Sequence, residues 1–287
     1  MDKQTATQLI GDTFNYPFDE GRFRNFAINL LNDVNEQKGF DYLSGTYIRH
    51  SFKNHITKYR RLGSYTDPNG EKIDVLVVQL ENEWALERSR TMLRNFTSDY
   101  LKNRDEKDAA LVAYYTTNPD DWRFSYIRME YKREKIESGK FKITQDITPA
   151  KRYSFLVGKN EPNHTAQAQL VGILADDRNN PTLTELETAF SVDAVTKQFY
   201  KDYRAQFEKL WSELNDIVTK DPKIAEEFET KTIATANFAK KLMGQIVFLY
   251  FLQKTGWLGV GKDESGNFKE WGTGPKNFLR RLYDKEF

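Results

Sequence analysis

The fold is decided by residues 56–101, which read ITKYRRLGSYTDPNGEKIDVLVVQLENEWALERSRTMLRNFTSDYL. The segment Asp67-Pro68-Asn69-Gly70 predicts a tight turn, because proline fixes φ and Asn-Gly tolerates a positive φ. Two β-forming runs, Tyr59–Tyr65 and Lys72–Leu80, flank this turn and predict a hairpin. The second run is almost wholly apolar, which is typical of a central strand covered on both faces. A helix with several arginines follows, so the local order is strand, turn, strand and basic helix.

The surrounding sequence extends this hairpin into a sheet with helices on it. A helix is predicted after Tyr16-Pro17-Phe18-Asp19, and Ala109–Thr116 predicts another buried strand. This order indicates a mixed sheet of the α/β or α+β class over residues 1–160. A further strand is predicted over Trp122–Lys132, and two more, antiparallel to it, over Lys140–Ile147 and Arg152–Gly158.

The composition shifts after residue 160 and becomes helical from residue 191. Residues 161–190 combine turn-rich segments with a short helix near Gln167–Leu174 and are predicted to be a linker. Residues 191–287 carry apolar side chains at three- and four-residue steps, which predicts an all-α helical domain. The run IVFLYFL at 246–252 is apolar all round and predicts burial in a bundle. The chain ends in what resembles a helix in mid-course, so we expect a fragment of a larger protein.

Composition excludes several classes of function. The chain has 43 Lys and Arg against 42 Asp and Glu, so nucleic-acid binding would require a local basic patch. Cysteine is absent, which excludes disulfides, a thiol nucleophile and cysteine-based zinc sites and fits a reducing cytoplasm. The sequence shows no signal-peptide pattern, and no apolar run approaches the ~20 residues of a membrane span. We therefore expect a cytoplasmic protein that does not bind membranes.

Basic residues cluster just before and within the hairpin. Seven of the thirteen residues from 49 to 61 are Arg, Lys or His, which indicates either a solvated edge or a surface for phosphate contacts. The helix after the hairpin adds further arginines. The candidate DNA contacts are Arg49, Lys53, Lys58, Arg60, Arg61, Arg88, Arg90 and Arg94.

Two groups of carboxylates are candidate metal sites. In the first, Pro119-Asp120-Asp121 and Glu130-Tyr131-Lys132 match the PD-(D/E)xK pattern, in which two carboxylates hold Mg²⁺ and the lysine helps to activate water. However, nine residues of one strand would place Asp121 and Glu130 roughly 30 Å apart and on opposite faces. Unless a sharp bulge intervenes, the segment is an ordinary turn followed by an exposed strand.

The second group is Asp74 with Gln79 and Glu81, at the second hairpin strand and beside the basic helix. A hairpin, a helix and a further strand in this order suit a nuclease core, and polar groups on a buried strand require a reason. However, Gln79-Leu80-Glu81 lacks the lysine, and Asp74 lies on the opposite strand face from both other residues. The alternative is a polar strand end without a metal.

A family resemblance is carried by seven segments. They are YPFDEGRFRNFAINLL, LGSYTDPNGEKIDVLVV, ALERSRTMLRNF, PDDWRFSYIRMEYK, PAKRYSFLVGKNEPNHTAQAQL, FSVDAVTKQFYKDYRAQF and IVFLYFLQKTGWLG. Together they resemble the front of large bacterial type IIG restriction–modification proteins, in which one polypeptide both cleaves DNA and methylates adenine. The resemblance covers essentially all 287 residues, and the helix ending in QKTGWLG is its most specific part.

The resemblance implies a restriction-endonuclease-like α/β domain at the front, followed by a helical connector. In such proteins a methyltransferase domain and a target-recognition domain come next. This chain lacks the Asn-Pro-Pro-Tyr tetrapeptide and the glycine-rich cofactor loop of the methylase. Binding of S-adenosylmethionine and methylation are therefore not expected, and double-stranded DNA is the expected partner.

The expected activity is Mg²⁺-dependent hydrolysis of DNA phosphodiesters. Asp74 and Glu81 would hold the metal, with Glu130 as a further ligand, and Lys132 or Lys72 would activate the attacking water. One alternative is a degenerate nuclease fold that serves as a DNA-docking or scaffold module for the methyltransferase. A third interpretation makes the helical region a spacer without DNA affinity.

Overall fold

The structure is a computed structural model that describes residues 1–43, 48–82, 86, 89–103, 107–135 and 141–286. Side chains at 43, 130–135, 141–149 and 192–194 lie outside this description. The chain forms two compact units, Met1–Thr196 and Lys197–Phe287. The first unit combines a mixed sheet with helices, which confirms the mixed α/β class predicted from the sequence.

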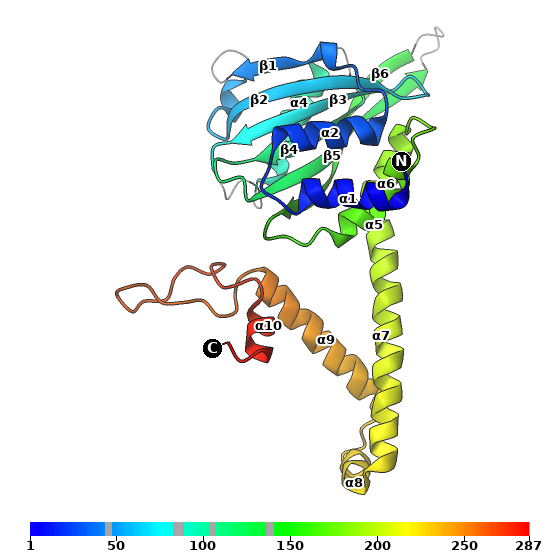
Figure 1. Cartoon of the computed structure of the whole chain (residues 1–287), viewed down its shortest axis with the longest axis vertical. Coiled ribbons are helices and arrows are strands. Elements are labelled where there is room, and N and C mark those ends of the chain that lie inside the picture. Colours follow the sequence, from blue (N-terminus) through cyan, green and yellow to red (C-terminus); the bar gives the residue numbers. More distant parts are fainter. Residues whose placement is uncertain (44–47, 83–85, 87–88, 104–106, 136–140, 287) are drawn as a thin grey trace. The chain divides into compact units, whose positions relative to one another are not determined.

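The six strands of the first unit form one mixed sheet whose spatial order follows the chain (Figure 1). Neighbouring strands are antiparallel except β3 and β4, which are parallel because helix α4 (Arg90–Lys102) connects them. Single 3₁₀ turns, η1 (Glu36–Lys38) and η2 (His50–Phe52), lie before and after β1. The strands are β1 (Phe40–Leu43), β2 (Ile56–Thr66), β3 (Lys72–Leu80), β4 (Ala109–Tyr115), β5 (Asp121–Lys135) and β6 (Phe141–Gly158).

The predicted hairpin is present as β2 and β3. Gly70 takes the left-handed φ of +84° that an Asn-Gly pair favours in a turn. Asp67 closes the turn, because its Oδ1 accepts the backbone N–H groups of Asn69 at 2.8 Å and Glu71 at 2.9 Å. The turn therefore satisfies its own backbone donors and fixes the pairing of the two strands.

The last strand differs from the sequence prediction. Two strands are predicted, at Lys140–Ile147 and Arg152–Gly158, but the structure has one continuous strand, β6. Pro149 does not end it, because residues 146–149 lie opposite a register shift between Met129 and Tyr131 on β5. A proline lacks an N–H donor and is tolerated at a bulge on an edge strand.

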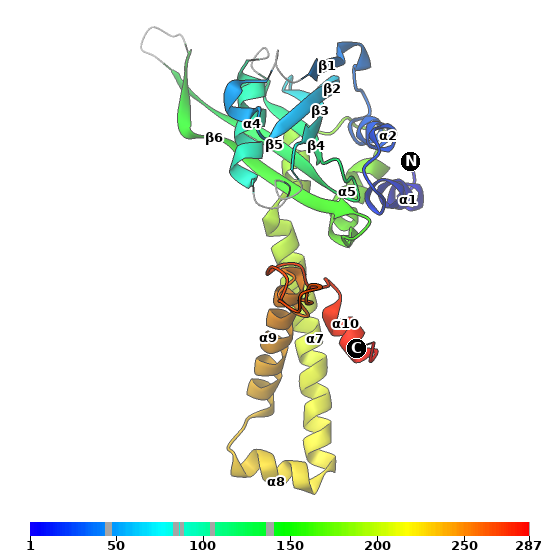
Figure 2. The same ribbon diagram turned by 90° about the vertical axis from the view of Figure 1, so that its left-hand side faces the viewer.

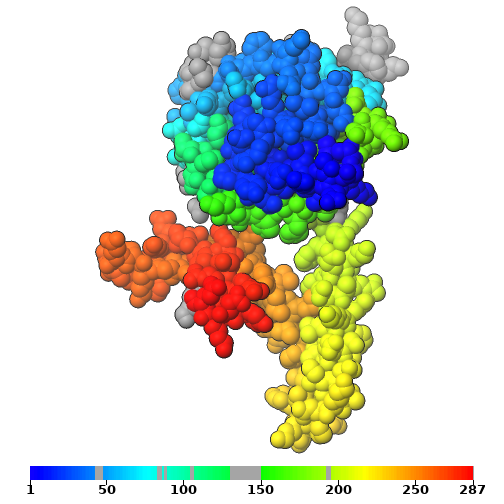
Figure 3. Space-filling model, viewed as in Figure 1, coloured from blue at the N-terminus to red at the C-terminus, as the bar shows by residue number. Residues whose placement is uncertain are grey.

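Side chains alternate along the strands, so the sheet has two apolar faces. Helices α1 (Lys3–Phe14), α2 (Glu20–Leu31), α5 (His164–Ala175) and α6 (Leu183–Phe190) cover one face, around Phe124. Helix α4 covers the other face, where Phe96 belongs to the same buried cluster as Val78. Figure 2 shows α4 on one side of the sheet and α1 and α2 on the other, and Figure 3 shows α1 and α2 lying over the first face.

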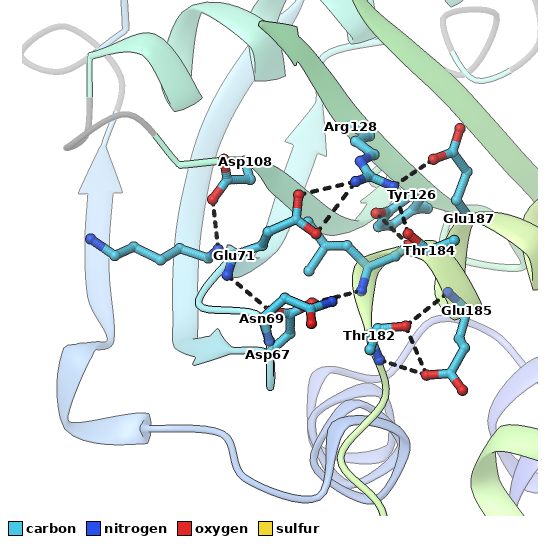
Figure 4. Close-up of polar contacts among 12 residues, drawn as sticks. Asp67, Asn69, Glu71, Asp108, Tyr126, Arg128, Thr182, Thr184, Glu185 and Glu187 are labelled. Atoms are coloured by element: carbon cyan, nitrogen blue, oxygen red, sulfur yellow. Dashed lines mark hydrogen bonds and ion pairs between the residues drawn. The ribbon is translucent and has the colours of Figure 1, made fainter. Parts of the chain in front are cut away.

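Polar contacts fix helix α6 to the hairpin turn (Figure 4). Oδ2 of Asp67 accepts the backbone N–H of Leu183, the first residue of α6, at 3.0 Å. Arg128 on β5 donates to Glu71 in the turn at 3.0 Å and to Glu187 on α6 at 2.7 Å. The segment predicted to be a linker therefore ends in a helix that packs on the sheet of the first unit.

The second unit contains most of α7 (Val192–Lys220), followed by α8 (Pro222–Thr230), α9 (Thr235–Lys254) and α10 (Phe278–Tyr283). Asp221 caps α8 by accepting the N–H of Lys223 at 2.9 Å. In α9, Ile246 is 43% and Phe248 is 59% exposed, so the described residues do not bury this run in the predicted bundle. Among the described helices, none combines the length and the apolarity that crossing a membrane requires.

Candidate functional site

Asp74, on β3, is completely buried and surrounded by polar partners. Its carboxylate accepts the Tyr100 hydroxyl of α4 at 2.7 Å and the Ser64 hydroxyl of β2. Two cations approach it, with Arg61 Nη1 at 3.3 Å and Lys107 Nζ at 3.7 Å. Both carboxylate oxygens are therefore occupied by groups of the fold itself.

This network accounts for a charge inside the core. A buried carboxylate is costly unless cations and hydrogen-bond donors compensate it. Burial, and then the neighbouring charge of Asp74, raises the pKa of Tyr100 well above its ordinary value, so the hydroxyl stays protonated and donates. A metal ion at Asp74 would have to displace these partners.

The two carboxylates predicted to share a metal lie far apart. Glu81 lies seven positions after Asp74, or about 23 Å along an extended strand. Glu81 accepts the Thr57 hydroxyl at 2.7 Å. Lys72 is the first residue of β3 and so lies at the opposite end of the strand from Glu81. Its side chain lines a cavity of about 310 Å³. Over the described part of the chain, no three His, Cys, Asp or Glu side chains gather into a metal site.

The PD-(D/E)xK match lies along the single strand β5. Asp121 begins the strand, and its Oδ1 accepts the backbone N–H of Asn160 at 2.9 Å. Glu130 falls at the register shift between β5 and β6, with Lys132 two residues further along. The side chains of Glu130 and Lys132 lie outside the described residues.

The basic cluster of residues 49–61 is largely neutralised by acidic side chains. Arg60 donates to Asp41, and this hydrogen bond lowers the pKa of the carboxyl group. Lys53 and Lys58 are exposed, and Arg88 lies outside the described residues. The cluster offers less unpaired charge to phosphate groups than its sequence indicates. Its ion pairs are Arg49 with Asp99 at 2.7 Å, Arg60 with Glu20 at 2.5 Å and with Asp41, and Arg61 with Asp74 at 3.3 Å.

A different set of arginines lines a groove of about 520 Å³ beside edge strand β6, which we call the arginine groove. Arg90 and Arg94 come from the start of α4, Arg123 from β5 and Arg152 from β6. Strand alternation places Arg123 and Arg152 on the face that α4 covers, beside the buried Ile127. Four guanidinium groups from three elements therefore converge on one groove.

The contacts of these arginines leave positive charge uncompensated. Nε of Arg123 donates to the Leu86 carbonyl oxygen at 2.8 Å, whereas Nη1 of Arg152 is buried without a hydrogen-bond partner. Burial lowers the pKa of Arg152, and the charges of Arg90 and Arg94 lower it further. Within the described residues, no carboxylate forms an ion pair with Arg90, Arg94 or Arg152. Such a cluster is stabilised when an anion enters it.

The start of α4 adds to this positive field. Ser89 is its N-cap but makes no side-chain hydrogen bond to the first turn. The backbone N–H groups in the first turn of a helix have no partner within the helix and point out of its N-terminus. Together with the helix dipole, they favour an anion at that end. Arg90 and Thr91, the first two residues of α4, both line the arginine groove.

Sequence reasoning identified Arg90 and Arg94 but missed Arg123 and Arg152. The available signal was periodicity, because Arg123 shares a strand face with the apolar Ile127 and Met129. A charged residue at a core-facing position of an alternating strand requires a partner or a ligand.

Comparisons of the chain with protein-family models, with curated proteins and with solved structures gave no match.

Proposed function

We propose that the first unit is a DNA-docking module that holds the phosphodiester backbone in the arginine groove and does not cleave it at Asp74. The observation that carries this proposal is the convergence of four guanidinium groups, of which Arg90, Arg94 and Arg152 have no described carboxylate partner. Arginine binds phosphate through paired hydrogen bonds that a point charge cannot make. A net charge of +1 for the whole chain makes a local site of this kind necessary for binding.

The resemblance to type IIG restriction–modification proteins favours DNA over other polyanions. In a longer polypeptide of that type, the methyltransferase and target-recognition domains would read the sequence. The docking module would supply contacts to the backbone, which position a protein on DNA without carrying sequence information. A restriction-endonuclease-like fold that has lost its metal site would serve this purpose.

The proposal is tested by fluorescence anisotropy with a labelled 20-base-pair duplex in EDTA, over a range of NaCl concentrations. Binding should weaken steeply with salt, because each neutralised phosphate contributes about −0.9 to the slope of log K against log salt. Replacing both Arg90 and Arg94 with Ala should weaken binding about tenfold or more and make that slope shallower by about 2.

The matched control removes two exposed cations from elsewhere on the first unit, Lys3 and Arg178, by substitution with Ala. This variant has the same net charge as the groove variant, so it should bind almost as tightly as the parent chain. Equal losses in the two variants, or no binding at low salt, would overturn docking through the arginine groove.

Mg²⁺-dependent DNA cleavage is the second candidate. The order of a hairpin, a helix and a parallel strand in β2, β3, α4 and β4 favours it, because this is the order expected of a nuclease core. Glu130 and Lys132 would act there with Asp74, and Mg²⁺ would supply the Lewis acid. Nicking of a supercoiled plasmid with Mg²⁺ or Mn²⁺, abolished in a Lys132→Ala variant that keeps its thermal midpoint, would establish cleavage and refute pure docking.

A further inference from the structure

The arginine groove wraps around the edge of the sheet. Arg152 and Ser154 lie on the face of β6 that α4 covers, and Tyr153 and Phe155 lie on the opposite face. Thr165, the second residue of α5, lines the groove as well. Residues from both faces of the sheet therefore border the arginine groove.

Two helices begin at this groove without a side-chain cap. The N-cap residues are Ser89 for α4 and Asn163 for α5, and neither side chain accepts a hydrogen bond from the first turn of its helix. Uncapped first-turn amides need another acceptor. Nη1 of Arg152, buried and without a partner, needs an acceptor in the same region. These observations are independent of one another, and each indicates an anionic ligand.

The charge of the groove is high for its size. A volume of about 520 Å³ lies within the range of small-molecule sites, about 300–1,000 Å³. An internal phosphodiester brings one negative charge for each phosphate group. A terminal phosphate group brings about two charges, and a triphosphate brings more in the same space. Four guanidinium groups in a groove of this size are therefore better matched by a terminal or condensed phosphate.

The groove also has an apolar wall. Phe155 and Val195, both partly exposed, line it together with the arginines, and Phe190, which is only 3% exposed, packs on Phe155 with 5.0 Å between the ring centroids. Aromatic side chains beside a cationic groove are typical of sites that stack a base while arginines hold its phosphate. A simple inorganic anion would leave this wall without a contact.

We propose that the arginine groove binds a nucleotide through its terminal, multiply charged phosphate group, with the nucleoside against the apolar wall. This proposal deepens the DNA-docking function and rests on it for the expectation that the ligand is a nucleic acid or one of its components. Two sources supply the same chemistry, the 5′-phosphorylated end of a DNA strand and a free nucleoside triphosphate.

The experiment uses the full chain and three probes. Two are duplexes of identical sequence with blunt ends, one carrying 5′-phosphates and the other 5′-hydroxyls, measured by anisotropy. The third is ATP without metal, measured by calorimetry and as a competitor of the duplexes. We expect the 5′-phosphorylated duplex to bind about tenfold more tightly, the effect of one further charge-assisted hydrogen bond, or ATP to bind and compete.

The outcomes separate the two sources and the two proposals. A 5′-phosphate preference without ATP binding assigns the groove to strand ends, and ATP binding without that preference assigns it to free nucleotides. Equal, salt-dependent binding of both duplexes without ATP binding overturns this inference and leaves DNA docking intact. ATP binding in the absence of any duplex binding upholds the inference and refutes DNA docking.

Variants locate the site. Arg152→Met should abolish whichever is observed, the 5′-phosphate preference or the ATP binding. Arg90→Ala should weaken the same property and, because Arg90 is exposed, should leave the fold undisturbed. The control is again Lys3→Ala with Arg178→Ala. Full retention of the preference in both groove variants would contradict the assignment to the arginine groove.

Discussion

The hydroxyl of Tyr100 on α4 donates to Oδ2 of Asp74 on β3 at 2.7 Å, inside the layer between helix and sheet. The same carboxylate is approached by Arg61 and Lys107, whose side chains are 13% and 8% exposed. Asp74 thus places a negative charge beside two largely buried cations. The stability of a variant that lacks this negative charge can therefore show whether Asp74 is a structural carboxylate or a metal ligand.

Asp74→Asn should destabilise the protein even in EDTA. The substitution keeps the shape of the side chain but removes the negative charge that faces Arg61 and Lys107, and loss of one partner of a buried pair costs about 3–5 kcal/mol. Urea unfolding followed by circular dichroism measures this change. The control is Asp41→Asn, which removes an exposed partner of Arg60 and should cost about 1 kcal/mol or less. If Asp74 were a vacant metal ligand, its replacement would not lower stability in EDTA.

Asp67→Ala should also destabilise the first unit, by about 2–3 kcal/mol, because it leaves the buried N–H of Leu183 and two partly buried turn N–H groups without an acceptor. The carboxylate accepts N–H groups of Asn69 and Glu71 in the turn and of Leu183 in α6. Asp263, in the second unit, closes an exposed turn in the same way and forms no side-chain hydrogen bond beyond that turn among the described residues, so Asp263→Ala is the matched control. Equal costs in thermal or urea unfolding would show that the contact with α6 contributes little.

Alkaline pH should destabilise the fold through its buried tyrosines. Burial raises the pKa of Tyr114 to about 12, against about 10 in an unfolded chain. The protonated form is therefore favoured in the folded state, and this contribution is complete below pH 10 and is lost as the pH rises toward 12. Tyr114→Phe should make the fall of unfolding free energy between pH 10 and 12 less steep. Tyr283→Phe, at a residue 80% exposed, should leave the slope unchanged.

Arg152→Met should raise the stability of the ligand-free chain while it weakens DNA binding. The substitution removes a partly buried cation whose Nη1 lacks a hydrogen-bond partner and which is repelled by Arg90 and Arg94, and apolar replacements of buried charges often stabilise by about 1–4 kcal/mol. A shift of the thermal midpoint upward, with a loss of duplex affinity, is the signature of a residue kept for binding. A lower midpoint in the absence of ligand would indicate that Arg152 has a structural role.

Phosphate or sulfate should reproduce part of this effect on the parent chain. An anion that binds only the folded state raises the midpoint as its concentration rises. Because Arg90 and Arg94 line the arginine groove without a described carboxylate partner, the increase should be smaller in the variant with both Arg90→Ala and Arg94→Ala. Chloride at the same ionic strength serves as the control, and an identical response to both anions would contradict a specific site.

Local chemistry explains why much of the first unit could be predicted. The turn at 67–70 follows from proline, asparagine and glycine, and the apolar run of β3 follows from burial on both faces. These features depend on residues next to each other in the chain. The continuity of β6 past Pro149 could not be predicted, because it depends on a register shift in the neighbouring strand.

The sequence by itself determined the hairpin, the basic helix and the mixed α/β class, because turn chemistry and hydrophobic periodicity are local. Only the tertiary structure decided which charges are available. It paired Arg60 and Arg61 with carboxylates and enclosed Asp74, whereas it brought Arg123 and Arg152 to the start of α4. The physical reason is that the availability of a charge depends on its neighbours across strands and helices, and these neighbours are distant in sequence.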